Sequence, residues 1–438
     1  MNKQRVLVLA LIAGGLVSPV AHATNGYFSH GYGMKAKGMG GAATAMTIDT
    51  FGGANNPASM VWVGDRIDIG VDLFSPKRSV SRQGATGGGG FYNGSADSDS
   101  TLFLIPEFGY NKLINPNTSL GVTVYGNGGM NTDFNTPLAG PPFAACGAAQ
   151  ANMLYGCGKL GVDLMQLIVA PTVAYKINES NSVGISPLLG YQKFKVDGLQ
   201  AFTVLSASQS NVTNLGYDTS TGYGIRIGWQ GRLSSTVTLG AAYSTKMKMG
   251  KFDKYKGLFA EQGGFDIPEN YSVGVAIKTA PNTTVAVDIQ QINYSKVAAI
   301  ANGVANSLLA PPANPLGSAA GSGFRWADQT VFKLGVEHEY GSNWTARAGF
   351  NYGKSPIGSA INDVTFNILA PGVVEKHLTL GATYKTSSGG ELTFSYMHAF
   401  ENSVTGPSAA SLLGAGDMGT ETLKMHQDSI GIAYGWKM

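Results

Sequence analysis

The sequence predicts an all-β protein, a fourteen-stranded antiparallel transmembrane β-barrel with an N-terminal hatch, or plug, inside its lumen. Short segments with an apolar residue at every second position recur from about residue 65 to the end. In residues 429–436, for example, Ile430, Ile432, Tyr434 and Trp436 share one face. The connections alternate between short and long, and too few other elements exist to cover the apolar faces. A lipid bilayer can cover them, and a closed barrel leaves no strand edge unpaired.

The N-terminus predicts a secretory signal peptide over residues 1–23. Lys3 and Arg5 precede an apolar run over 6–17, and the small-residue pattern Ala-His-Ala over 21–23 is typical of a cleavage site. The apolar run is too short to cross a bilayer as a helix. We therefore expect an exported protein.

Composition excludes several classes of protein. The charged fraction is 13% and no basic block is present, so nucleic acid is not an expected partner. After the signal peptide, no run approaches the roughly 20 consecutive apolar residues of a membrane-spanning helix. The mean hydropathy of +0.02 suits strands with one face in lipid and the other in water.

Fourteen segments carry the period-two pattern. In a soluble β protein the outward faces would be charged, whereas here the non-apolar faces consist mainly of Gly, Ala, Ser and Thr, so a soluble multi-sheet protein is disfavoured. The expected strands are 66–74, 102–111, 119–127, 164–177, 182–196, 222–233, 236–246, 271–278, 283–294, 330–340, 344–352, 377–385, 391–399 and 429–437.

The lengths of the connections indicate which end of the barrel faces the periplasm. Short turns rich in Asn, Gly, Pro and Ser alternate with long loops, as periplasmic turns and external loops do in outer-membrane barrels. An even strand count places both ends of the barrel on the periplasmic side. The short turns are 114–117, 178–181, 234–235, 280–282, 341–343 and 386–390, and the long loops are 75–101, 128–163, 197–221, 247–270, 295–329, 353–376 and 400–428.

Residues 24–64 break the alternation. They are rich in Gly and Ala, with scattered Met, Phe and Tyr, whereas a free tail would be polar and charged. Such a composition suits close packing in a narrow space, and a fourteen-strand barrel leaves a lumen that needs closing. We therefore expect three parts, the signal peptide over 1–23, the hatch over 24–64 and the transmembrane barrel over 65–438.

The hatch carries motifs that resemble the FadL family of outer-membrane transporters. These motifs are Gly31-Tyr32-Gly33, the run Gly-Met-Gly-Gly-Ala over 38–42, and Asn56-Pro57-Ala58 just before the first strand. Segments 268–275, 347–356 and 380–384 resemble the family as well, so the resemblance covers essentially the whole mature chain. The C-terminus departs from the common aromatic ending, because Trp436 is followed by Lys437 and Met438.

The resemblance implies a monomeric barrel with a hatch in its lumen, placed in the bacterial outer membrane as a multi-pass protein. It implies passive uptake of long-chain fatty acids or similar hydrophobic molecules. Such cargo would be captured between external loops, pass to an inner apolar pocket, and leave sideways through the wall when the N-terminus rearranges. Alkanes or aromatic hydrocarbons are the alternative cargo. Outer-membrane lipid and lipopolysaccharide are the other expected partners.

Candidate gating residues follow from the glycines and from the hatch motifs. Glycines near the end of the third strand would weaken its pairing and permit a bend, and the alternative is that they only begin the following loop. Asn56 is expected to order the turn from hatch to barrel, and Pro57 to stiffen it. The candidates are Gly31, Gly33, Asn56, Pro57, Ala58, Gly126, Gly128 and Gly129.

Candidate ligand-binding residues come from the hatch and from two long loops. Residues 252–260 read as a short helix with Phe252, Tyr255, Leu258 and Phe259 near one face. The preceding loop supplies Phe202 and Leu205, and the hatch supplies Tyr27, Phe28 and Tyr32. Exposed apolar loops could capture a hydrophobic ligand, and the alternative is packing of loop on loop. Lysines around 246–256 could attract carboxylates or lipopolysaccharide phosphates, or could form a solvated face.

No pattern in the sequence indicates catalysis. The histidines are scattered over separate elements, without a local nucleophile motif, so we expect no enzyme activity. Cys146 and Cys157 lie in one loop and are expected to form a disulfide in an exported protein. Two thiols alone make a poor metal site, and we expect no metal and no cofactor.

Transport of an apolar molecule remains the main hypothesis, because it needs only apolar surface shielded from water and, for a fatty acid, a cation for the carboxylate. A surface adhesin barrel and an open polar porin are the rival hypotheses. The hatch argues against the porin, and the apolar loops argue against simple adhesion.

Overall fold

The computed structural model describes residues 25–140, 149–309, 314–414 and 416–438. The signal peptide expected over 1–23 and the half-cystine Cys146 lie outside these residues, so both the cleavage site and the disulfide stay predictions.

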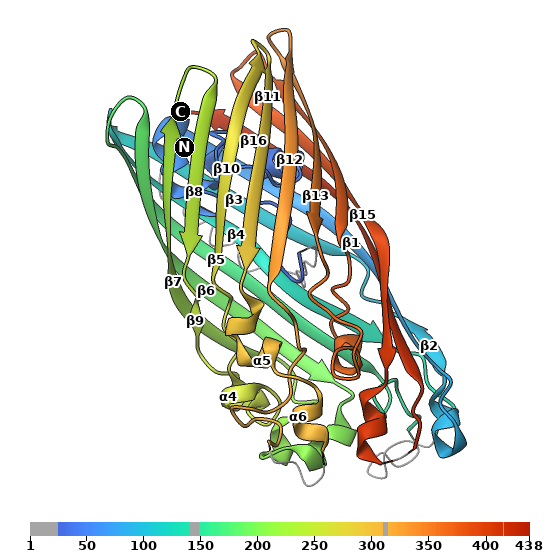
Figure 1. The fold of residues 1–438 in the computed structure, drawn as a ribbon. Coiled ribbons are helices and arrows are strands. Elements are labelled where there is room, and N and C mark those ends of the chain that lie inside the picture. The colour runs from blue at the N-terminus through green and yellow to red at the C-terminus, as the bar shows by residue number, and fades with distance from the viewer. Residues whose placement is uncertain (1–24, 141–148, 310–313, 415) are drawn as a thin grey trace.

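Fourteen of the described strands form a closed antiparallel ring, which confirms the predicted fold class (Figure 1). Each pairs with its neighbour in chain order, and the ring closes where Arg66 of the first strand lies opposite Lys437 of the last. The strands are β1 (Arg66–Gln83), β3 (Phe103–Asn115), β4 (Thr118–Phe134), β5 (Leu160–Lys176), β6 (Asn181–Asp197), β7 (Asp218–Arg232), β8 (Val237–Ser244), β10 (Asn270–Ala280), β11 (Thr283–Ile292), β12 (Gln329–Tyr340), β13 (Trp344–Gly353), β14 (Lys376–Lys385), β15 (Gly390–Pro407) and β16 (Thr420–Lys437).

Two short strands lie outside the ring. β2 (Gly94–Asp97) pairs with β1, and β9 (Lys248–Met249) pairs with β7. The described α-helices are single turns, α2 (Met34–Lys37), α3 (Met60–Val63), α4 (Ala260–Gly263), α5 (Ala298–Ala301) and α6 (Ala305–Leu308). None of the described helices has the length and apolar character needed to cross a membrane.

The two faces of the wall are inverted relative to a soluble protein. In β1 the outward residues Ile69 and Leu73 are 50% and 40% exposed, while the inward residues Arg66, Asp68 and Asp72 are buried. The same outward apolar band continues on the other strands, and paired rings such as Trp344 on Tyr384 lie beside the short turns. This arrangement is that of a wall facing lipid with an interfacial aromatic belt.

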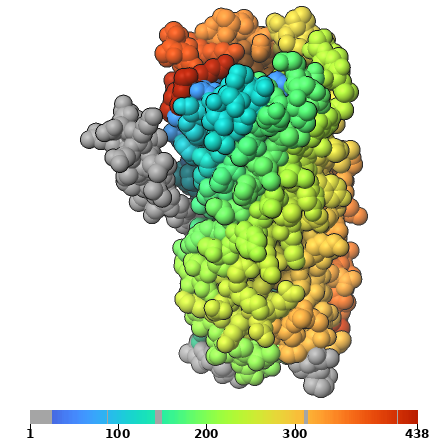
Figure 2. All heavy atoms as spheres, turned by 90° about the vertical axis from the view of Figure 1, so that its left-hand side faces the viewer, coloured from blue at the N-terminus to red at the C-terminus, as the bar shows by residue number. Residues whose placement is uncertain are grey.

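The two ends of the barrel differ, and we call them the turn end and the loop end. The C-terminus lies with the short turns, whereas β2 and helices α4 to α6 gather at the opposite end (Figure 1). Seen from the side, the molecule is elongated along the direction that joins these two ends (Figure 2).

Two long loops are shorter than expected. Residues 75–101 and 400–428 were expected to be loop, but β1 continues to Gln83, β15 continues to Pro407 and β16 begins at Thr420. Outward side chains here are polar, as with the hydrogen-bonded hydroxyls of Thr405 and Thr422. Beyond the bilayer the outer face no longer needs apolar residues, so pairing continues after the period-two signal has ended.

The helix expected over 252–260 is wrong. A single 3₁₀ turn covers Asp253–Tyr255, and α4 begins only at Ala260. Phe252, Tyr255 and Phe259 all pack on Phe194, with ring centroids 4.6 to 5.4 Å apart, and this contact with the wall overrides the helical periodicity.

A buried ion pair joins the loops at the loop end. The guanidinium of Arg82 donates to Oε1 of Glu421 at 2.5 Å and to the carbonyl of Met153 at 2.8 Å, and both charged side chains are fully buried. The second carboxylate oxygen accepts a hydrogen bond from Thr365 at 2.6 Å. The connection that holds Met153 and the connection that holds Thr365 are therefore both tied to the β1–β16 pair.

Residues 25–64, which we call the N-terminal segment, fill the lumen toward the turn end. Main-chain amides of Ala43 and Thr44 donate to Asp288 on β11, and the side-chain amide of Asn56 donates to the carbonyl of Trp229 on β7. A Cβ on Gly240 would lie 2.1 Å from the carbonyl oxygen of Thr44, so this close approach requires glycine on the wall. The segment therefore touches strands around the ring.

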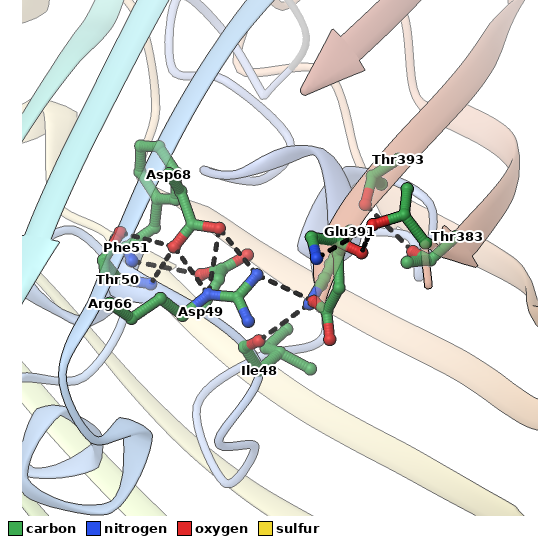
Figure 3. A network of polar contacts seen from close by, with 12 residues as sticks. Ile48, Asp49, Thr50, Phe51, Arg66, Asp68, Thr383, Glu391 and Thr393 are labelled. Atoms are coloured by element: carbon green, nitrogen blue, oxygen red, sulfur yellow. Dashed lines mark hydrogen bonds and ion pairs between the residues drawn. The ribbon is translucent and has the colours of Figure 1, made fainter. Parts of the chain in front are cut away.

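Ion pairs also fix the N-terminal segment. Lys37 Nζ lies 2.8 Å from Asp72 and 3.9 Å from Glu107, and Lys35 Nζ lies 2.5 Å from Glu391. Figure 3 shows the adjoining network, in which Thr50 donates to Asp68 and Arg66 bridges Asp68 and Glu391. Burial and the nearby Asp68 carboxylate raise the pKa of Asp49.

Candidate functional site

An apolar pocket lies inside the barrel near the loop end. Its side chains come from β4, β5, β6 and four of the long connections, and Ser322 is the one polar side chain among them. The lining consists of Met130, Val162, Leu164, Phe194, Val196, Leu199, Phe202, Leu258, Phe259, Phe265, Ala299, Ser322, Gly323, Phe324, Phe366 and Leu369.

A second apolar cavity of about 280 Å³ lies among the loops beside this pocket. Phe202 lines both cavities and packs edge-on against Phe366, with ring centroids 5.1 Å apart. Leu205, Val204 and Leu308 also line the outer cavity. Val204 is 56% exposed, so the outer cavity borders solvent. An apolar molecule could reach the inner pocket by displacing the Phe202 ring.

The structure brings some of the expected ligand residues to these cavities and not others. Phe202, Leu258 and Phe259 line the inner pocket, and Leu205 lines the outer cavity. Phe252 and Tyr255 pack behind them against Phe194 and line neither cavity.

Several lining residues were missed from the sequence. Val162, Leu164, Phe194 and Val196 lie on inward faces of β5 and β6. Elsewhere these inward faces carry polar residues such as Gln166 and Gln192. A change from polar to apolar on the lumen face, at the loop end of both strands, is a signal that could have identified the pocket.

The floor of the pocket is an aromatic cluster around Tyr27. Its ring lies 5.3 Å from Phe28, 5.5 Å from Tyr294, 6.0 Å from Trp326 and 6.3 Å from Phe265. The Tyr294 hydroxyl donates to the carbonyl of Asn25 at 2.5 Å. The start of the N-terminal segment therefore closes the pocket toward the turn end.

Beside this cluster the wall is incompletely paired. β3 and β4 pair from Asn115 and Thr118 only as far as Phe108 and Val124. From that point toward the loop end, β3 pairs only with β1 on its other side, and β4 pairs only with β5. Near the loop end the chain that leads into β3 contacts β4 again, where the amide of Asp99 donates to the carbonyl of Asp133 at 2.8 Å. We call the interval between these two points the seam.

A β-bulge lies in the seam. The register of β4 on β5 shifts between Gly126 and Gly128, so Asn127 is the extra residue. The strand was expected to end at Asn127, but it continues through these glycines and Gly129 to Phe134, so they do not begin a loop. A bulge keeps the strand going while its ladder is locally disrupted, which a residue-by-residue alternation does not reveal.

The N-terminal segment docks on this bulge. The amide of Ser29 donates to the carbonyl of Asn127 at 3.2 Å, and Phe28 forms a β-bridge with Gly128. The Tyr32 hydroxyl donates to the Asn127 side chain at 3.2 Å, and its ring lies 4.6 Å from Tyr125. One short stretch therefore holds both the pocket floor and the seam.

The remaining hatch candidates lie away from the pocket. Gly33 has a φ of +85°, and its amide donates to Glu107 at 3.2 Å. Gly31 packs against Gly41. The Asn56 side chain accepts from the amide of Ala58 at 3.1 Å, with Pro57 between them at the start of a 3₁₀ turn.

A polar cavity lies on the other side of Tyr32 from the pocket. Arg226, Asp288, Gln290 and Lys333 line it together with Tyr32. Among the described residues, no cluster of three or more His, Cys, Asp or Glu side chains is arranged to hold a metal ion. The buried rings of His30 and His377 stack with centroids 6.2 Å apart, without a nucleophile between them.

A family model described as "Outer membrane protein transport protein (OMPP1/FadL/TodX)" matches residues 21–437. The toluene transporter TodX of P. putida has a similar fold, with a TM-score of 0.69 and 16% identity over 93% of this chain and 99% of that one. A FadL homologue of Pseudomonas aeruginosa gives a TM-score of 0.66 and 14% identity over 94% and 99%. The toluene transporter TbuX of Ralstonia pickettii gives 0.62 and 18% over 93% and 99%. No curated protein matches the chain significantly.

Proposed function

The chain belongs to the outer membrane protein transport family (OMPP1/FadL/TodX), and on this premise we propose that it takes up long-chain fatty acids or similar hydrophobic molecules passively. Members of this family are outer-membrane β-barrels that transport hydrophobic compounds. Its structural neighbours are transporters and channels rather than enzymes. The family therefore gives the class of the protein, an outer-membrane transporter of hydrophobic compounds, whereas the cargo and the route are our proposals.

The observation that carries the proposal is an apolar pocket that adjoins an unpaired seam in the wall. Met130 lies in β4 just beyond the bulge and lines the pocket, so the two features share one stretch of strand. A water-filled channel would need a polar lining along the lumen. An apolar pocket that ends at a side wall instead suits a molecule whose destination is the bilayer.

The route that we propose has three steps. The outer cavity beside Phe202 and Leu205 captures the molecule from the external side. The molecule then enters the inner pocket past the Phe202 ring. Release of Tyr27 and Phe28 from the bulge opens the seam, and the molecule leaves sideways into the outer membrane. No step requires an external energy source, because capture moves apolar surface out of water and the later steps move it between apolar environments.

In this proposal residues 25–64 act as the hatch, and the chain functions as a monomer after removal of residues 1–23. Outer-membrane lipid covers the exposed band of Ile, Leu, Val and Tyr, and lipopolysaccharide meets the lysines near the loop end. The disulfide between Cys146 and Cys157 would brace the long loop over residues 135–159.

Aromatic hydrocarbons are the second candidate cargo. The inner pocket contains no charged side chain and is rich in phenylalanine, which suits a neutral ring. The structural neighbours TodX and TbuX are described as toluene transporters. The two candidates therefore differ in whether a carboxylate is carried.

Uptake by Gram-negative cells that lack their own transporter tests the proposal. Cells expressing this gene are expected to take up labelled oleate faster than cells with an empty vector, and a parallel assay with labelled toluene tests the second cargo. No increase for either compound, with the barrel shown to be folded in the outer membrane, would refute hydrophobic uptake.

A further inference from the structure

Arg78 occupies an unusual position at the loop end of the seam. It lies on the inward face of β1 and is 6% exposed. Its guanidinium donates to the carbonyl of Asn131 on β4 and to the carbonyl of Ser100, just before β3. These two carbonyls stand on opposite sides of the seam, so the Arg78 side chain bridges it.

The charge of Arg78 is not balanced by a carboxylate within the described residues. Of the four other buried arginines, Arg66, Arg82 and Arg347 pair with Asp or Glu at 2.5 to 2.8 Å, and Arg226 donates to the carbonyl of Gly53 and lines a polar cavity with Asp288. The hydrogen bonds of Arg78 go only to neutral carbonyls, its guanidinium lies 5.9 Å from the centre of the Phe103 ring, and its Nε has no hydrogen-bond partner among the described residues. A buried cation without a counter-ion is costly, and it therefore points to a ligand that supplies the negative charge.

The surroundings of Arg78 place it on the proposed route. A narrow gap beside it is lined by Tyr27, Met130, Asn131 and Trp326. Met130 also lines the apolar pocket, and Tyr27 belongs to the cluster that closes that pocket. The guanidinium thus lies between the pocket and the seam, where the polar end of a molecule leaving the pocket would pass.

We propose that Arg78 binds the carboxylate of an anionic amphiphile as it moves from the pocket into the seam, which makes Arg78 a specificity-determining residue. This inference rests on the proposed function. A carboxylate accepts two parallel hydrogen bonds from guanidinium, and these are stronger than bonds to neutral carbonyls. The incoming carboxylate therefore takes the donors from Asn131 and Ser100, and the seam loses its bridge. A neutral hydrocarbon cannot make this exchange.

Binding and uptake of oleate and oleyl alcohol test the inference, because the two differ only at the polar end. Arg78→Met is expected to weaken oleate binding to the purified barrel by about tenfold or more, with a matching loss of uptake. Binding of oleyl alcohol is expected to stay unchanged. Arg78→Lys, which keeps the charge, should recover part of the oleate binding. Lys77→Met removes an exposed charge from the outward face of the same strand and is the matched control.

Each outcome is decisive. Equal losses for acid and alcohol in Arg78→Met, or no loss for oleate, would overturn the carboxylate site. If that variant does not fold, the wild-type comparison decides, because equal affinity for the two compounds would also overturn it. Wild-type binding of the alcohol alone would refute this inference and leave hydrophobic uptake standing. Binding of neither compound would refute both this inference and the uptake of long-chain molecules.

Discussion

Replacing Gly128 with alanine is expected to release the start of the N-terminal segment from the wall and open a passage through the barrel. A Cβ at this position would lie 1.8 Å from the carbonyl oxygen of Tyr27 and 2.8 Å from its carbonyl carbon. Both atoms are backbone, so residues 27–28 as a whole must move. The Ser29–Asn127 hydrogen bond and the packing of Tyr27 would be lost together.

The expected increase in the open population is large, because residues 27–29 make several weak contacts that would be lost together. A hydrogen bond contributes about 1 kcal/mol and an aromatic pair about 0.5–1.5 kcal/mol, so losing several shifts the open population by two orders of magnitude or so. Conductance in planar bilayers should rise from a closed baseline to frequent openings. Gly250→Ala is the control, because its nearest contact would be an ordinary 3.4 Å. Unchanged conductance in Gly128→Ala would show that residues 25–29 do not close the barrel.

Replacing Lys37 with methionine is expected to destabilise the N-terminal segment by about 3–5 kcal/mol. Lys37 is the ion-pair partner of both Asp72 and Glu107, and all three side chains are buried. Its removal leaves two carboxylates facing each other without a cation. The thermal unfolding temperature of the detergent-purified barrel should fall, and proteolysis of the N-terminal segment should accelerate.

Lys35→Met is the matched comparison for Lys37→Met. Its partner Glu391 keeps Arg66 at 2.7 Å, so we expect a clearly smaller loss. Adding Asp72→Asn and Glu107→Gln to Lys37→Met should restore much of the stability, because the repelling charges are then gone. Equal losses for the two lysine variants would mean that the uncompensated carboxylates are not the cause.

The strands were predictable because lipid on one side and polar lumen on the other impose a period of two. All fourteen expected segments overlap an observed strand. Their ends were less predictable, as in β16, which begins at Thr420 rather than 429. Beyond the bilayer the outward residues are polar, so the period-two pattern disappears. The hydrogen bonds between the strands nevertheless continue.

The site was only partly predictable. The apolar character of two loops identified Phe202, Leu258 and Phe259, because an apolar loop residue has few reasons to exist on an exposed surface. The seam could not be predicted, since alternation shows which face a residue occupies and not where two strands stop pairing. Arg78 was missed for the same reason, because its role depends on its distance from β4, which lies two strands away.

Deleting Asn127 tests the central claim most directly, namely that cargo leaves through the seam. The deletion removes the extra residue, restores a regular register with β5, and allows the β3–β4 ladder to extend. Asn127→Ala keeps the bulge while removing the side-chain bonds to Gln166 and Tyr32, and serves as the control. With both variants folded in the outer membrane, oleate uptake is expected to fall to the level of empty cells for the deletion and to persist for the alanine variant. Wild-type uptake by the deletion variant would contradict lateral release.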